Sequence, residues 1–131
     1  MNNASTDSVG YLVVRVSTAR GAIPLENATV SVRGSSAENS GIIYSLETNS
    51  SGLTPRLPLP TPQKSLSQSP NESVPFSLWN VDVYCKGFIS AKFLNLPVYP
   101  EVTSVQSAEL IPLSEGFSAS ESYNESNSPD L

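Results

Sequence analysis

The absence of histidine limits the chemistry of this sequence more than any other feature. Among its 131 residues there is no histidine, so a Ser-His-Asp or Cys-His arrangement cannot form, and neither can the commonest kinds of zinc site. The side chain that most often serves as a general base near neutral pH is missing as well. We therefore expect no catalytic residue, no metal ligand and no cofactor-binding residue, and predict that the chain is not an enzyme.

The single cysteine, Cys85, is the one thiol in the sequence. A reactive cysteine needs an electropositive and partly exposed setting. Lys86 is adjacent, but neighbouring residues on a strand point to opposite faces, so its charge is not directed at the thiol. We expect Cys85 to be a buried structural residue, because a free cysteine behaves as a small hydrophobic side chain. With no internal disulfide possible, the core alone must hold the fold.

The acidic residues between the two ends of the chain stand one at a time. No Asp-x-Asp-x-Asp loop for calcium occurs, and solvated turns and strand faces account for such scattered charges. A carboxylate pair assembled across strands, as in a glycosidase, stays open from one sequence. A hydrolase is therefore kept as the least favoured alternative.

Two groups of residues are candidates for contacting a partner. The first lies in the polar stretch from Pro60 to Pro75, which is too long for an ordinary connection, and loops of this length are usually functional or mobile. The second is a set of aromatic side chains that can form a platform for sugars. Trp79 is expected in the core instead, because it alternates in phase with Val81 and Val83. The candidate partner-binding residues are Gln63, Lys64, Leu66, Asn71, Tyr84 and Tyr99.

The elements that must position these side chains are indicated by short segments in which apolar and polar residues alternate. Such a pattern predicts strands with one face in the core, and Pro55 and Pro58 place the fourth of them at a sheet edge. The fifth is the richest in apolar and aromatic residues and is expected at the centre of its sheet. No segment has apolar residues at a sustained helical spacing, so we expect no long helix. About seven short strands predict an all-β sandwich. The expected strands cover residues 11–17, 28–33, 42–48, 53–59, 76–85, 88–98 and 105–113.

The distribution of charge argues against two classes of partner. The net charge is −5, but four acidic residues follow Ser114, where no Lys or Arg stands, so residues 1–113 carry only −1. Seven scattered basic residues form no stripe able to neutralise several phosphates, so we predict no nucleic-acid partner. No apolar run approaches the length of a spanning helix and no basic amphipathic helix occurs, so we also predict no membrane binding.

Composition divides the chain into one domain with polar ends. The first residues lack the basic and apolar regions of a secretory signal, so we expect no signal peptide in this chain. The last residues are acidic and low in complexity, which is typical of disorder. We predict a flexible N-terminus at 1–9, a folded domain at 10–113 with its long loop at 60–75, and a disordered acidic tail at 114–131.

Three segments carry a resemblance in their order and spacing. They read Ala-x-Pro-Leu-x-Asn-Ala-x-Val-x-Val over 22–32, Thr-Asn-x-x-Gly-Leu over 48–53, and Val-x-Val-x-x-x-Gly-Phe over 81–88, after a strand that begins at Gly10. In this the chain resembles the carboxypeptidase regulatory-like domain, over roughly residues 10–96. Two features depart from that pattern: Phe76-Ser77-Leu78-Trp79 stands where a Gly-x-Tyr opening is usual, and the loop at 60–75 intrudes before it.

The resemblance implies a fold and a kind of role, and no catalytic residues. The implied fold is a seven-stranded, antiparallel or mixed Greek-key sandwich of the transthyretin (prealbumin-like) type. Segments 56–62 and 98–113 look like a subset of these domains found in Gram-positive, clostridial-type bacteria. We expect a non-catalytic interaction or spacer module of a bacterial envelope or spore protein, monomeric or weakly dimeric, with an unidentified protein or cell-wall glycan partner. A carbohydrate- or peptidoglycan-binding module is the alternative.

Overall fold

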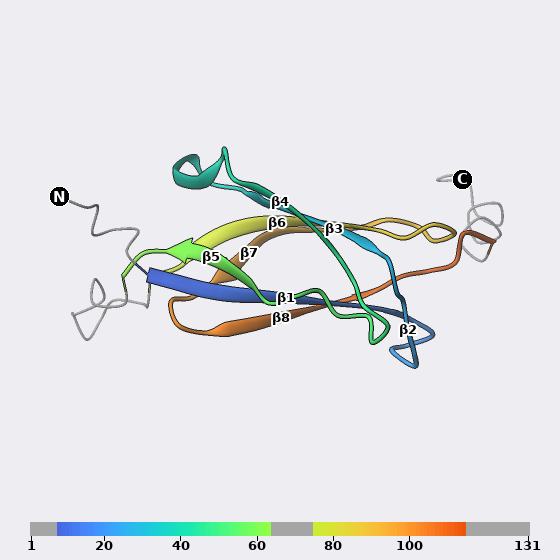
Figure 1. The fold of residues 1–131 in the computed structure, drawn as a ribbon. Coiled ribbons are helices and arrows are strands. Elements are labelled where there is room, and N and C mark those ends of the chain that lie inside the picture. Colours follow the sequence, from blue (N-terminus) through green and yellow to red (C-terminus); the bar gives the residue numbers. More distant parts are fainter. Residues whose placement is uncertain (1–7, 64–74, 115–131) are drawn as a thin grey trace.

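A computed structural model describes residues 8–63 and 75–114, which form two packed β-sheets and almost no helix (Figure 1). The prediction of an all-β sandwich is thereby confirmed. Among the described residues, one short 3₁₀ turn, η2 (Ala37–Asn39), lies between two of the strands. The eight strands of the described part are β1 (Ser8–Thr18), β2 (Ile23–Pro24), β3 (Thr29–Gly34), β4 (Ile43–Glu47), β5 (Leu57–Thr61), β6 (Ser77–Tyr84), β7 (Ala91–Val98) and β8 (Thr103–Glu109).

The two sheets have different hydrogen-bonding patterns. In the first sheet β1 is central, with β5 and the two-residue β2 antiparallel to it and β8 parallel to it. The second sheet is antiparallel throughout, in the order β4-β3-β6-β7. Thus β6 lies between two strands, and β5, which carries prolines, lies at an edge, as the sequence predicted.

The first and last strands of the described part lie side by side. The parallel register runs from Tyr11 opposite Thr103 to Ser17 opposite Glu109. Because both strands run in the same direction, β1 starts at one end of the sandwich and β8 finishes towards the other. Ser8 and Ser114 therefore lie at opposite ends of the molecule (Figure 1).

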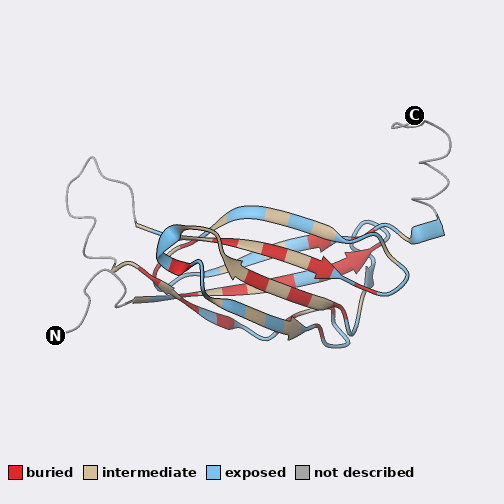
Figure 2. Cartoon of the chain, turned by 90° about the horizontal axis from the view of Figure 1, so that it is seen from above, coloured by how far each residue is buried: buried red, intermediate tan, exposed pale blue. Residues whose placement is uncertain are grey.

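The core lies between the sheets and is built by alternation along the strands, which appears as bands of buried residues in Figure 2. Trp79, Val81 and Val83 of β6 are completely buried, and Cys85 is 9% exposed, as the sequence predicted. The buried hydrophobic side chains are Leu12, Val14, Val16, Ala28, Val30, Val32, Leu57, Leu59, Trp79, Val81, Val83, Cys85, Val98, Ala108 and Leu110.

The Thr-Asn-x-x-Gly-Leu segment is a structural turn. The Thr48 hydroxyl donates to the Leu25 carbonyl at 2.7 Å and accepts from the Ala28 N–H at 2.9 Å, so one buried side chain satisfies two backbone groups. The Asn49 side chain accepts from the N–H groups of Ser51 and Leu53, an Asx turn. The motif therefore fixes the path between β4 and the segment leading to β5.

The last expected strand, 105–113, ends earlier in the structure. β8 stops at Glu109, and the residues after it pair with the turn that follows β6: the Ile89 N–H donates to the Ile111 carbonyl at 2.9 Å and the Leu113 N–H to the Gly87 carbonyl at 2.9 Å. Pro112 has no N–H and cannot continue a ladder. The sequence also missed β2, because two residues are too few for a periodic pattern.

Some predictions fall on residues outside the described ranges. These are the flexible N-terminus over 1–7, the part of the long loop at 64–74, and the acidic tail from residue 115 on. Within 8–63 and 75–114, no helix is long and apolar enough to span a membrane.

Candidate functional site

The predicted partner-binding residues do not form one site. Lys64, Leu66 and Asn71 lie outside the described residues. Tyr84 is 56% exposed at the end of β6, whereas Tyr99 follows β7 next to the opposite end of β6, where Ser77 pairs with Val98. Only Gln63 and Tyr99 lie near the same feature, the pocket described next.

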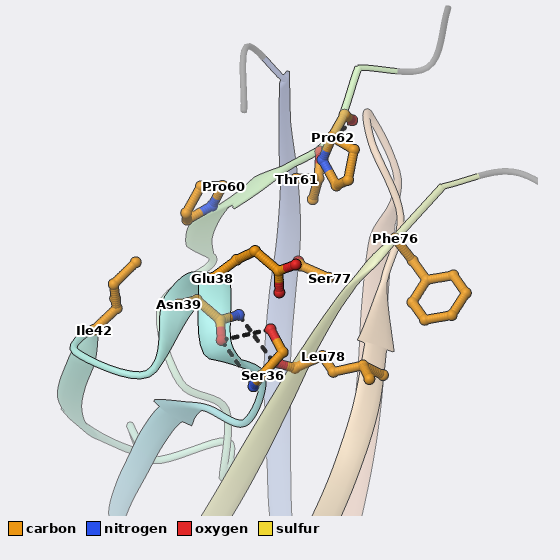
Figure 3. Close-up of a pocket in the computed structure, with 10 residues that line it drawn as sticks. All are labelled: Ser36, Glu38, Asn39, Ile42, Pro60, Thr61, Pro62, Phe76, Ser77 and Leu78. Carbon is orange, nitrogen blue, oxygen red and sulfur yellow. Dashed lines mark hydrogen bonds between the residues drawn. The ribbon is translucent and has the colours of Figure 1, made fainter. Parts of the chain in front are cut away.

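A pocket of about 520 Å³ opens at the end of the sandwich where β5 finishes and β6 begins (Figure 3). Three segments distant in sequence line it: the turn around η2, the end of β5, and the start of β6. Its lining residues are Ser36, Glu38, Asn39, Ile42, Pro60, Thr61, Pro62, Phe76, Ser77 and Leu78.

Asn39 fixes the wall of this pocket that η2 supplies. Its side-chain oxygen accepts from both the N–H and the hydroxyl of Ser36, each at 3.0 Å, and its side-chain nitrogen donates to the Leu78 carbonyl at 3.0 Å. Gly34 permits this contact, because a Cβ at that position would collide with the Asn39 carbonyl. A buried amide thus ties the turn around η2 to β6 at the pocket wall.

The lining combines apolar surface with a few polar groups, as is usual for small-molecule sites. Ser36, Thr61 and Ser77 supply hydroxyls, and Glu38 is the one charged residue among the described residues that line it. The Trp79 indole donates to the Ser77 hydroxyl at 2.7 Å, which connects the core tryptophan to the pocket wall.

Tyr99 reaches the pocket only through another ring. Its ring and that of Phe76 have centroids 5.5 Å apart in an edge-to-face arrangement, a favourable geometry for aromatic pairs. Sequence reasoning missed Ser36, Glu38 and Asn39. The Ser-x-x-Asn spacing between Gly34 and Gly41 was the available signal, since Ser and Asn at this spacing cap a turn.

A second, shallower hollow of about 300 Å³ lies on the outer face of the second sheet. Asp82 and Tyr84 are among the residues that line it. One Asp82 carboxylate oxygen lies 3.0 Å from an Arg33 side-chain nitrogen, and the other lies 3.8 Å from the Lys92 nitrogen. Partly exposed ion pairs of this kind contribute little stability. Across the part of the chain that the structure describes, no group of three or more Cys, Asp or Glu residues is placed to hold a metal ion.

Cys85 gives a testable consequence of burial. Desolvation raises the pKa of its thiol, so the folded state holds the proton to a higher pH than the unfolded state. The contribution of this thiol to the free energy of unfolding is complete below the ordinary thiol pKa of about 8.5 and falls as pH rises from there through the folded pKa.

We expect a thiol-specific chromogenic reagent at pH 8 to label the native protein much more slowly than the urea-unfolded protein. Equal rates in the two states would show that the thiol is accessible.

Comparison with known proteins supports the fold of the chain but assigns it to no family. No family model matches the chain, and no curated protein matches it. Among solved structures, it is similar to the Bacillus anthracis TIE protein, with a TM-score of 0.51 and 17% identity over 80% of this chain. It is also similar to 3-chlorocatechol 1,2-dioxygenase from Rhodococcus opacus 1CP, with a TM-score of 0.53 and 13% identity over 86% of this chain. The chain shares their fold.

A third match is chlorocatechol 1,2-dioxygenase from Pseudomonas putida, with a TM-score of 0.46 and 16% identity over 82% of this chain. The chain spans 17%, 63% and 61% of the lengths of these three proteins, in the order given. It thus corresponds to part of each.

The likeness to a dioxygenase corrects the prediction that this chain is not an enzyme. The Rhodococcus protein is an enzyme with the same fold, so the sandwich architecture cannot be used to exclude catalysis. The prediction was wrong because it was argued from a missing residue type, whereas chemistry is added to a scaffold at local sites that differ between proteins of one fold.

Proposed function

We propose that this chain is a spacer and interaction module of a larger bacterial envelope or spore protein. We propose further that it is a carboxypeptidase regulatory-like domain with the Greek-key, prealbumin-like arrangement. Setting aside the two-residue β2 leaves seven of the eight described strands, the number that such a sandwich requires. The match to only 17% of the TIE protein supports a role for this fold as a small part of a long chain.

The position of the chain ends carries the proposal. Ser8 and Ser114 are at opposite ends of the sandwich (Figure 1), and the first and last strands run in the same direction. Neighbouring domains would therefore continue in line rather than fold back beside it. With a rise of about 3.3 Å per residue, the 11 residues of β1 give each copy a length of about 35 Å along the strands.

Surface display tests the spacer role. The chain is placed between a wall anchor and an antibody epitope on a Gram-positive cell, as no copy, one copy or two copies in tandem. We expect antibody binding to increase with each copy, because every copy moves the epitope farther from the wall. An epitope that is equally accessible in all three arrangements would contradict the proposal.

A glycan-binding module is the second candidate, because the pocket combines hydroxyl groups with an aromatic pair at Phe76 and Tyr99. Sugars commonly stack on exposed rings, and their hydroxyls pair with such polar groups. Sedimentation with insoluble peptidoglycan tests this function, with Phe76→Ala as the pocket variant and Tyr84→Ala as the control at the other end of β6. Loss of sedimentation in Phe76→Ala alone would favour it, and no sedimentation of the wild-type protein would exclude it.

A further inference from the structure

The ladder between β1 and β8 joins the two ends of the described chain. Seven residue pairs, from Tyr11–Thr103 to Ser17–Glu109, lie in parallel register. The hydrogen bonding extends past both ends of the ladder. At one end the Glu101 N–H donates to the Val9 carbonyl at 2.8 Å and the Tyr11 N–H to the Val102 carbonyl at 2.9 Å. At the other end Leu110 is bonded to β1 through both its N–H and its carbonyl.

Tension on the two chain ends would load this ladder in shear. A pull on Ser8 away from Ser114 moves β1 and β8 past each other along their common axis, because the strands are parallel and the ends lie at opposite ends of the sandwich. The inter-strand hydrogen bonds of a parallel pair are slanted but evenly spaced, so this movement strains all of them at the same time. They must therefore yield together, whereas strands that are peeled apart lose them one at a time.

The rest of the first sheet holds β1 in place against this movement. Along its other edge the Val16 N–H donates to the Gly52 carbonyl at 2.7 Å, and Val14 exchanges bonds with Thr54: the Val14 N–H donates to the Thr54 hydroxyl at 2.9 Å, and the Thr54 N–H to the Val14 carbonyl at 3.0 Å. Leu12, Val14 and Val16 are also buried in the core. Detachment of β8 from β1 is thus the step that tension must drive.

The segment after β8 offers little resistance of its own. It is tied to the turn after β6 by the backbone bonds of Ile89 with Ile111 and of Leu113 with Gly87. These bonds lie beyond the ladder and are few, so tension would release them first and would then reach the ladder itself.

We propose that the β1–β8 ladder is a mechanical clamp that lets this domain carry tension between its two ends. The inference rests on the proposed spacer function, since only a domain with neighbours on both sides is pulled in this direction. In this role the spacer domain transmits force between its neighbours while it stays folded.

Single-molecule force spectroscopy with two pairs of attachment points tests the clamp. Ser8→Cys with Ser114→Cys loads the ladder in shear, and Ser8→Cys with Val102→Cys, at the same end of both strands, peels it open. The native Cys85 is buried and does not compete for attachment. Forced unfolding reports the unfolding rate under load, so we expect an unfolding force several times higher in the first geometry. Equal forces in the two geometries would overturn the proposal.

A matched pair of proline variants tests the role of individual hydrogen bonds. The Leu110 N–H donates to Ser17, and alternation along a parallel strand directs the Gln106 N–H towards β1 as well and the Ser107 N–H to the open edge. Proline removes the N–H in either case. We expect Gln106→Pro to lower the unfolding force in the shear geometry markedly, and Ser107→Pro to lower it much less. The same loss in both variants would contradict the clamp.

The two proposals fail separately. If Gln106→Pro does not fold, as judged by circular dichroism, the comparison of attachment points in the wild-type sequence still decides. Low force in the shear geometry together with increased epitope accessibility would remove the clamp and leave the spacer. A high unfolding force in the shear geometry without increased epitope accessibility would show a mechanically resistant fold and would contradict the spacer role.

Discussion

Trp79→Ala is expected to lower the free energy of unfolding by about 3–5 kcal/mol, the usual loss for a buried Trp truncated to Ala. Trp79 is 0% exposed and is the largest fully buried side chain of the described core. Its replacement leaves a cavity between the sheets and removes the indole donor of the Ser77 hydroxyl. Because small domains have only about 5–15 kcal/mol in total, the variant should be close to unfolding at room temperature. Urea denaturation followed by far-ultraviolet circular dichroism measures the change.

Tyr84→Ala is the control on the same strand. Tyr84 is 56% exposed, and surface substitutions usually change stability by no more than about 0.5 kcal/mol. If the two variants lost similar stability, Trp79 would not occupy the core position that the structure gives it.

Gly52→Ala is expected to lower the free energy of unfolding by about 2–4 kcal/mol, through backbone strain and a disturbed hydrogen bond. Gly52 has a φ of +77°, where residues with a side chain are strained, and its added Cβ would collide with the Val16 carbonyl. The Gly52 carbonyl also accepts from the Val16 N–H at 2.7 Å. Any movement that relieves the collision would therefore weaken the edge of β1. Thermal unfolding measures the loss.

Gly41→Ala is the matched control for this substitution. A Cβ at Gly41 would meet no atom within 4 Å, and its φ lies outside the left-handed region. Replacing such a glycine restricts the unfolded chain, so stability should be unchanged or should rise by up to about 1 kcal/mol. Equal destabilisation by both alanines would mean that Gly52 is not held in the turn as described.

Local pattern predicted seven of the eight described strands, and the places of two of them within their sheets. Alternation around Trp79 predicted a central strand, and the prolines at 55 and 58 predicted an edge; both predictions are confirmed. The pairing of β1 with β8 was not predicted. Their residues are far apart in the chain, and one sequence carries no local signal for which distant strands pair, because that choice is made by the packing of the whole core.

The candidate site was predicted only in part, for a similar reason. Tyr99 and Gln63 were selected and lie near the pocket, but the walls from η2 and from the start of β6 come together only in the folded chain. Asn39 was not selected as a candidate, although its side chain is buried and donates to the Leu78 carbonyl. A polar residue that organises a turn has the same local sequence context as a solvated one.

The pairing of the first strand with the last also determines when this domain can fold. Thr18 and Leu110, bonded to each other beside the ladder, are 92 positions apart. Contacts between such distant residues form late and make folding slow. A ribosome delivers β1 first and β8 last, so one edge of the central strand stays unpaired until nearly the whole domain has emerged. During synthesis that edge is the part of the chain most in need of protection from pairing with other nascent chains.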